Sequence, residues 1–494
     1  MDKNKITRKG IELLSKAIIH AMPKNYFTAE NEAKKYMLSG DDKFTSVPGD
    51  NCFWCGFGKR VLTPDDINAD KYYIAGYDSN NPATGVLDDM YARAVYLADG
   101  TGRGGVIMCA IDAVGISRKD INEIRRLVLE NEDYPTLRSE LRSINICATH
   151  SHSAIDTQGL WGEKLYKSGR NEKFMKRLHQ KAAEAIIEAY ETSVIGKLYY
   201  AVKETEDLQF DCRTPNTFDS NLTRIRFEAD NSDHQIYIVN FASHAELLGD
   251  KTKNVSADFP AYMIKEIEDL KYNTDAVFFN GAIGGMISAK EIKKVYRNEI
   301  DCEAYTKEFG KNLGKLVTSM EDEKPLKPII NIKSKQVKIA ADNFVLILAR
   351  VLKVLNNDIA RSSKRDTAYI WSEVGYLELG DGEIGMFLIP GELFPELYNG
   401  EFLTADESAN AVDAHYRVLK DLGGAKHNFV VGLCNDELGY IIPDNDFILN
   451  EGMPYINSAK DRFDRNHYEE TNSTGRNTAR TLLEEMDKLI ASTK

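Results

Sequence analysis

The sequence predicts an α/β fold in which layered mixed β-sheets are flanked by helices. From about Phe53 onward, short apolar runs rich in β-branched and aromatic residues alternate with segments of helical periodicity, a pattern typical of chains that stack helices on sheets. Of the 494 residues, 43% are hydrophobic and 28% are charged. The chain is therefore globular in composition and long enough to bury a sizeable core.

The expected elements follow one another along the chain. The strands are expected over residues 144–148, 236–241, 276–279, 384–389 and 428–433. The helices between them are expected over residues 172–190, 260–270 and 413–422. Near the C-terminus, apolar residues at helical spacing predict one more amphipathic helix, with Ala479, Leu482, Leu483, Met486 and Ile490 on its apolar face.

The predicted organisation is a helical N-terminal extension, residues 1–50, followed by a single domain, residues 51–494. In the extension, the apolar residues that share one helix face are Ile11, Leu14, Ile18 and Met22. Residues 321–328 are highly charged and contain two prolines, which makes them a possible joint between subdomains.

Charge and hydropathy exclude two classes of partner. The chain carries 63 basic and 76 acidic side chains, a net charge of −13 with no evident basic stripe, so we expect no nucleic-acid partner. No apolar run reaches the roughly 18 residues of a transmembrane segment. Glu12 and Lys16 interrupt the apolar stretch that a signal peptide needs, so we expect a cytoplasmic protein, or a secreted one if a leader has been trimmed.

The cysteines do not form a recognisable framework. There are seven, which is an odd and sparse number for a disulfide scaffold. Cys52 and Cys55 form a lone C-x-x-C. Because no second pair accompanies it, we interpret it as two reduced thiols near the start of a strand rather than as a zinc ribbon.

Polar or glycine-rich turns follow all five expected strands. In chain order, these turns are residues 149–152 (THSH), 243–244 (SH), 280–285 (NGAIGG), 390–392 (PGE) and 435–440 (NDELGY). If the strands share a sheet and a direction, the turns meet at one edge, and in α/β sheets ligands bind at that edge.

The residue types in these turns suit a divalent metal ion. His150 and His152 are two residues apart, so on an extended chain their rings project from the same face. Two imidazoles and a carboxylate, such as His150, His244 and Glu392, suit Zn²⁺ and leave a position for water, whose pKa the ion lowers to about 7. A further imidazole beside the ion can shuttle protons.

Simpler interpretations of the same residues remain open. A lone H-x-H is often a hydrogen-bonded turn, and Glu392 also fits an acidic residue at a helix N-terminus. Tyr440 follows a glycine and also fits a packed aromatic residue. The glycine-rich loop at 281–285 has neither nucleotide-binding spacing nor a nucleophile elbow.

At these residues the chain resembles the neutral/alkaline non-lysosomal ceramidases, a family of zinc-dependent amidases that hydrolyse N-acylsphingosine. The similar motifs include Gly56-Phe57-Gly58-Lys59-Arg60, Ala83-Thr84-Gly85-Val86-Leu87-Asp88, Thr149-His150-Ser151-His152-Ser153, Ser256-Ala257-Asp258-Phe259-Pro260 and Ser473-Thr474-Gly475. The similarity runs from about Gly56 to the C-terminus. It implies the fold of the family's N-terminal catalytic domain, without the C-terminal β-sandwich that larger members carry.

The resemblance implies a role for individual residues. The family's zinc ligands fall on His150, His244, Glu392 and Tyr440, and its catalytic histidine, arginine and second tyrosine fall on His152, Arg213 and Tyr468. In the implied reaction, the metal polarises water and the amide carbonyl. Arg213 and Tyr468 donate hydrogen bonds to the developing oxyanion, and His152 protonates the leaving amine.

One motif departs from the family. The family's G-D-V-S-P segment reads Gly284-Gly285-Met286-Ile287-Ser288 here, so its serine position falls on Ile287 and Ser288 lies one residue late. A slip of one residue on a strand reverses the direction of the side chain. We therefore expect metal-activated water rather than serine chemistry.

The function hypothesis is a zinc-dependent, ceramidase-like amidase of lipid metabolism. It would cleave the amide bond of a small-molecule or lipid N-acyl substrate, with a sphingolipid as the first class to test. The alternatives are a metal-dependent esterase or carbohydrate deacylase on the same scaffold, which the altered 285–288 loop motivates, and a non-catalytic binding homologue. The sequence does not predict the oligomeric state.

Overall fold

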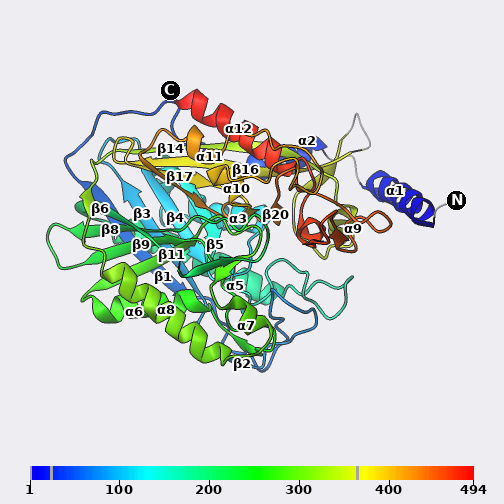
Figure 1. Ribbon diagram of the computed structural model, residues 1–494. Helices are drawn as coiled ribbons and strands as arrows, with labels where there is room; N and C mark the ends of the chain where they lie inside the picture. The colour runs from blue at the N-terminus through cyan, green and yellow to red at the C-terminus, as the bar shows by residue number, and fades with distance from the viewer. Residues whose placement is uncertain (1–2, 23–25, 206, 363–366) are drawn as a thin grey trace.

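The structure is a computed structural model that describes residues 3–22, 26–205, 207–362 and 367–494. Two mixed β-sheets lie in the middle of the molecule and helices cover their outer sides, with α12 on one side and α6 and α8 on the other (Figure 1). The predicted layered α/β architecture is confirmed.

The larger sheet contains, among the described residues, nine strands in the order β11-β9-β8-β6-β1-β3-β4-β5, with β13 paired to β6. They are β1 (Phe53–Val61), β3 (Tyr91–Ala98), β4 (Gly105–Ile111), β5 (Leu141–Ala148), β6 (Val194–Glu204), β8 (Asn221–Ala229), β9 (Gln235–Phe241), β11 (Thr274–Asn280) and β13 (Lys324–Pro325). The β4–β5 and β9–β11 pairs are parallel and the other pairs are antiparallel.

The smaller sheet runs in the order β14-β16-β17-β19, with β15 also paired to β16. Its strands are β14 (Ile330–Ala341), β15 (Ile359–Arg361), β16 (Ala368–Leu379), β17 (Ile384–Leu388) and β19 (His427–Val431). Only β17–β19 is a parallel pair among these described strands. Apolar side chains of both sheets, such as Ile225, Val277, Leu377 and Phe429, form one buried cluster between the layers.

Helices bury the outer faces of both sheets. The principal ones are α3 (Arg118–Leu129), α5 (Glu172–Glu191), α6 (Phe259–Leu270), α8 (Cys302–Thr318), α9 (Phe344–Val351) and α12 (Thr478–Thr493). In α5, Asn171 caps the N-terminus by accepting hydrogen bonds from Lys173 N and Phe174 N. Gly58 of β1 lets this helix approach closely, because a Cβ there would lie 2.2 Å from the carbonyl oxygen of Ala185. The second glycine of the Gly-x-Gly in the middle of β1 is thus a packing requirement.

The five predicted strands exist, as β5, β9, β11, β17 and β19, but they are divided between two sheets rather than sharing one. The predicted helices at 172–190, 260–270 and the C-terminus correspond to α5, α6 and α12.

The helix predicted over 413–422 is wrong except for its last turn, α11 (Leu419–Leu422). Hydrogen bonds from other loops to side chains of the residues before it accompany their non-helical path. The Asp413 carboxylate accepts a hydrogen bond from Ala405 N at 2.7 Å, and the Tyr416 hydroxyl accepts one from Asp444 N at 2.9 Å.

The N-terminal region contains α1 (Lys3–Ala21) and α2 (Tyr26–Lys34). Ile18 and Met22 are buried in the apolar cluster that also contains side chains of α9 and α12, whereas Leu14 is exposed. Residues 321–328 lie where the chain passes from the larger sheet to the smaller, and β13 lies within them. The division into an extension and one domain stays a prediction. Among the described residues, no helix combines the length and the apolar composition needed to cross a bilayer.

A buried ion cluster ties α3 to the smaller sheet. Arg118 Nη1 and Arg125 Nη1 each lie 2.8 Å from Glu373 Oε2 of β16, and all three side chains are at most 1% exposed. Arg125 Nη2 also donates to Asn435 Oδ1 at 3.1 Å, in the turn after β19. Burial alone would raise the pKa of Glu373, but the charges of Arg125 and Arg118 hold it below its ordinary value.

We expect Glu373→Gln to lower the free energy of unfolding by about 3–5 kcal/mol, because two buried guanidinium groups lose their counter-charge. Urea unfolding at pH 7 measures this loss. The difference from wild type should shrink as the pH falls below about 4.5, where the carboxylate is protonated in the unfolded chain and then in the folded one.

Glu303→Gln, which removes an exposed partner of Lys307 on α8, is the control and should shift the free energy by less than about 0.5 kcal/mol. Equal midpoints for wild type and Glu373→Gln would show that the cluster contributes nothing.

Candidate metal centre and cavity

The candidate site lies where turns from the two sheets meet. His150 follows β5 and His244 follows β9, both in the larger sheet. Glu392 and Tyr440 come after β17 and β19 of the smaller sheet, in a separate two-stranded sheet. There β18 (Glu392–Leu393) pairs in parallel with β20 (Tyr440–Ile441), so that these two residues are direct partners. Segments separated by up to about 290 residues therefore contribute to one site.

Main-chain carbonyls orient two of the imidazoles. His150 Nδ1 lies 2.6 Å from the carbonyl oxygen of Val114, and His244 Nδ1 lies 2.8 Å from that of Ile287. A carbonyl can only accept a hydrogen bond, so each Nδ1 carries a proton, and in the neutral imidazole each Nε2 presents a bare lone pair. This is the tautomer that a metal ion requires.

The donor atoms lie at the separations of a coordination sphere. His244 Nε2 is 3.1 Å and His150 Nε2 is 3.5 Å from the same oxygen of Glu392, Oε2. Zinc bonds of about 2.0–2.1 Å in a tetrahedral site place neighbouring ligand atoms about 3.3–3.4 Å apart. The residues therefore fit a zinc ion in both donor type and spacing.

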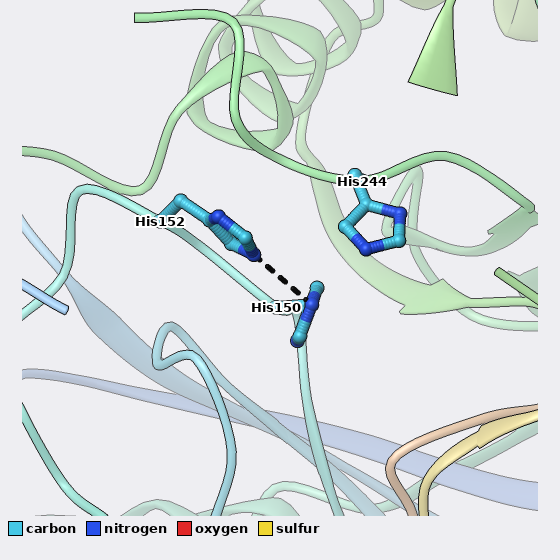
Figure 2. A group of neighbouring side chains, drawn as sticks. All are labelled: His150, His152 and His244. Carbon is cyan, nitrogen blue, oxygen red and sulfur yellow. Dashed lines mark hydrogen bonds between the residues drawn. The ribbon is translucent and has the colours of Figure 1, made fainter. Parts of the chain in front are cut away.

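His152 is the third imidazole of the group. Figure 2 shows its ring directed at His150, and the two Nε2 atoms are 3.0 Å apart. One ring nitrogen from each of His150, His152 and His244 lies within 4.8 Å of the others. The structure thus offers three imidazoles and a carboxylate, and His152 is near enough either to bind an ion or to act beside it.

The rings of His150 and His152 lie close together, but the backbone between them differs from the extended conformation that their spacing predicted. His150 adopts a left-handed conformation with φ of 66°, so the H-x-H segment is not the extended chain that we expected. For a non-glycine residue this conformation costs of order 1–3 kcal/mol, and such strain is concentrated at functional sites. The hydrogen bond from Nδ1 of His150 to Val114 holds the ring in this unusual position.

Burial and mutual charge set the protonation of these groups. Burial lowers the pKa of His152 well below its ordinary value, and the neighbouring imidazoles lower it further, so His152 is neutral at pH 7. Burial alone would raise the pKa of Glu392, but His150 and His244 hold it below its ordinary value, so it stays ionised. Burial alone would lower the pKa of His244, but its hydrogen bond to Glu392 holds it above its ordinary value, so a metal ion would displace that proton when it binds.

Glu246 is a buried carboxylate that sequence reasoning missed. Its Oε2 lies 3.9 Å from His152 Nδ1, an atom that is buried and has no hydrogen-bond partner in the described part of the chain. The hydroxyls of Tyr296 and Tyr77 donate to Glu246, at 2.9 Å to Oε1 and 3.3 Å to Oε2. One feature of the sequence could have indicated Glu246: it lies two residues after His244, in the same turn.

Tyr440 and Tyr468 meet at the same end of the site. Their hydroxyl oxygens are 3.3 Å apart, and the Tyr440 hydroxyl lies 3.0 Å from Met286 Sδ. Burial, followed by the negative charge of Glu392 for Tyr440 and of Glu469 for Tyr468, raises both pKa values well above the ordinary one. Both phenols are therefore hydrogen-bond donors at neutral pH. The roles of Tyr440 as a ligand and of Tyr468 in catalysis stay predictions.

Arg213 lies in a separate cluster of acidic side chains. Its guanidinium donates to Glu469 Oε2 at 2.8 Å and to Asp446 Oδ2 at 2.9 Å, and it lies 4.9 Å from the ring centroid of Phe394. Cys212, rather than Arg213, is among the residues that line the cavity described next. The role of Arg213 as an oxyanion donor stays a prediction.

A cavity of about 640 Å³ opens at the candidate metal centre. Its polar end contains His150, His152, Glu246, Glu392, Tyr440 and Tyr468, and much of the remaining wall is apolar, with Leu160, Trp161, Leu165, Leu346, Leu355 and Ile370. Ser288, whose participation the sequence left open, lies on β12 (Ile287–Ala289) and is not among the lining residues. This is a pocket that can hold an apolar chain against a polar reacting centre.

Comparison with known proteins shows the fold. No family model and no curated protein sequence matches the chain. Among solved structures, the neutral ceramidase from Pseudomonas aeruginosa superposes with a TM-score of 0.67 at 15% identity, over 90% of this chain and 74% of that one. A ceramidase complexed with C2 superposes with the same TM-score at 14% identity, over 90% of this chain and 75% of that one. The chain has the fold of neutral ceramidases, which confirms at the level of fold the resemblance seen in its motifs.

We expect the purified protein to hold about one zinc ion per chain, and we expect His150→Ala and His244→Ala each to lower that content at least tenfold, because each variant removes one of few ligands. Elemental analysis after dialysis against metal-free buffer measures the content, and circular dichroism confirms that each variant is folded.

The control is His234→Ala, because His234 pairs with Asp275 at 2.9 Å outside the cavity and should not affect metal content. A folded His150→Ala protein that retained the wild-type zinc content would refute the assignment.

Proposed function

We propose that the protein is a zinc-dependent hydrolase that cleaves the amide bond of an N-acyl compound. The observation that carries the proposal is the set of three donors, His150, His244 and Glu392, at coordination spacing on the polar end of an apolar cavity. These three residues would hold the ion, with Tyr440 as the predicted fourth ligand. When bound, the ion supplies a Lewis acid that polarises the carbonyl and makes water a nucleophile near neutral pH.

His152 is the proton carrier in this proposal. It is neutral at pH 7, so it can take a proton from the attacking water and deliver it to the nitrogen of the leaving amine. Glu246, 3.9 Å from His152 Nδ1, would stabilise the imidazolium that forms between these two steps. The pair supplies the proton that amide cleavage requires, because an amine is a poor leaving group until it is protonated.

Tyr468 supports the developing charge on oxygen. Its raised pKa keeps the phenol protonated, so it donates a hydrogen bond to the carbonyl oxygen as that oxygen becomes negative. Arg213 acts through its neighbours: it holds Glu469, whose carboxylate accepts a hydrogen bond from Tyr468 N at 3.1 Å. In this arrangement Arg213 is a positioning residue for Tyr468.

The apolar wall favours an acyl chain as part of the substrate. Each buried CH₂ group contributes about 0.8 kcal/mol to binding. The structural neighbours are ceramidases by name, which places an N-acyl lipid first among the compounds to test.

We expect the zinc-loaded protein to release free amine from at least one member of a panel of N-acyl amides, and His152→Gln to lower kcat by about 10²–10⁴ while zinc content stays at the wild-type level. Amine release and elemental analysis on the same samples measure both quantities. A loss of zinc in His152→Gln would instead identify His152 as a ligand.

The same panel includes simple esters and acetylated sugars, because the altered loop at 285–288 borders the cavity through Met286. Turnover of these compounds with none of the amides would favour an esterase or carbohydrate deacylase. Metal binding without turnover of any compound would favour a non-catalytic protein.

A further inference from the structure

Two buried cysteines face each other where the two sheets meet. Cys147 is the penultimate residue of β5, and Cys434 lies in the turn after β19. Both are fully buried in the apolar cluster between the layers, and their Sγ atoms are 2.9 Å apart. Neither residue lines the cavity or takes part in the proposed hydrolysis. The pair therefore needs an explanation of its own.

The backbone around the two cysteines has a register that allows a cross-link. Cys147 and Cys434 are partners in an isolated antiparallel bridge. Two main-chain hydrogen bonds flank the bridge: Ala148 N donates to Leu433 O at 3.1 Å, and Asn435 N donates to Ile146 O at 2.8 Å. The cysteines are thus a non-hydrogen-bonded pair, whose Cα atoms lie about 4.5 Å apart. That separation falls within the range of about 4.4–6.8 Å found across disulfide bonds.

The turn that carries Cys434 has an unusual backbone on both sides of this residue. Leu433 has φ of 49° and Asn435 has φ of 65°, in the left-handed region that non-glycine residues rarely adopt. Such a conformation persists only where surrounding contacts hold it. The bridge to β5 is one of these contacts, and a covalent bond at its centre would hold the turn against the strand.

The two cysteines also lie on the segments that lead to the candidate metal centre. Cys147 is three residues before His150, and Cys434 is six residues before Tyr440. His150 follows a strand of the larger sheet, and Tyr440 follows a strand of the smaller one. A bond between the cysteines would therefore join the backbone segments that bring these two residues together.

We propose that Cys147 and Cys434 form a disulfide bond that cross-links these two segments. The oxidant is a small disulfide of the glutathione class. One cysteine thiolate attacks it, which forms a mixed disulfide and releases one molecule of reduced glutathione. The second thiolate attacks the cysteine sulfur of the mixed disulfide and releases the other. The cysteines are oxidised, the small disulfide is reduced, and the two thiol protons end on the released glutathione molecules.

The bond forms while the chain folds. In the folded protein, burial raises the pKa of Cys147 well above its ordinary value, and the attacking species is the thiolate rather than the thiol. Both sulfurs are also out of reach of an oxidant once the sheets have packed, because both residues are fully buried. The same burial protects the finished bond from reductants.

The test makes the full chain by cell-free translation, once with a mixture of reduced and oxidised glutathione and once with dithiothreitol. The soluble protein is unfolded in urea and its free thiols are labelled with iodoacetamide, and mass spectrometry counts the labels. We expect seven labels on the reduced protein and five on the oxidised one, because two of the seven cysteines are in the bond. Peptide mapping without reduction should locate the bond between Cys147 and Cys434.

Variants of single cysteines sharpen the count. Cys147→Ala and Cys434→Ala should each take six labels under both conditions, because the remaining cysteine has lost its partner. Cys109→Ala is the control, since Cys109 is equally buried and lies on β4, the strand next to β5. This variant should take six labels when reduced and four when oxidised.

The bond should also stabilise the fold. It closes a loop between residues 287 positions apart, and a disulfide typically lowers the equilibrium constant for unfolding about 30- to 1,000-fold. The urea midpoint of the oxidised wild-type protein should therefore lie above that of the reduced protein. Cys109→Ala should show the same shift on oxidation, and Cys147→Ala should show none.

Seven labels on the oxidised wild-type protein would overturn the proposal, and so would a bond mapped to another pair, such as Cys52 and Cys55. A mapped bond between Cys147 and Cys434 that left the urea midpoint unchanged would refute its role in holding the two segments together. The label count requires neither metal nor turnover, so the proposed hydrolysis and this cross-link can each fail while the other stands.

Discussion

Two hydrogen bonds to main-chain carbonyls fix the direction of the imidazoles at the candidate metal centre. The carbonyl of Val114 holds His150 and that of Ile287 holds His244, so that both Nε2 atoms lie near the Oε2 atom of Glu392. Neither carbonyl belongs to the turn of the histidine that it orients. The donor geometry therefore depends on the relative position of several backbone segments, and a shift of one of them would rotate a ring away from the site.

The packing of the two sheets sets those positions. The histidines come from turns of the larger sheet, and Glu392 and Tyr440 come from two short paired strands that follow β17 and β19 of the smaller sheet along the chain. The Arg118–Arg125–Glu373 cluster links α3 to β16, and through Asn435 it reaches the turn that also carries Glu437 and Tyr440. A buried ion cluster is a weak source of net stability, but its hydrogen bonds connect α3, β16 and the turn after β19. The fold thus brings ligands from segments that follow strands of both sheets to one point, and the packing restricts the movement of these segments.

The sequence alone predicted the elements better than their assembly. Periodicity and the polar turns located β5, β9 and β17 and the residues His150, His244 and Glu392, because these signals are local. It did not predict which strands share a sheet, since pairing depends on contacts between residues far apart in the chain. Glu246 was missed for the same reason: it is ordinary in its own segment, and its importance comes from the cavity that other segments complete. The left-handed φ of His150 is a further case, because a tertiary hydrogen bond overrides the extended conformation expected for that segment.

The balance of charge around the cavity argues for a cation. Glu246, Glu392 and Glu437 all line it, and burial followed by the charge of Glu392 raises the pKa of Glu437 well above its ordinary value. Arg213 cannot offset these carboxylates, because Asp446, Glu469 and Glu470 already surround its guanidinium. Buried carboxylates without a counter-charge are costly, and the protein can meet that cost either by protonating one of them or by binding a divalent ion. A proton on His244 Nε2 satisfies only His244 and Glu392, whereas an ion between Glu392 and both Nε2 atoms satisfies His150 as well.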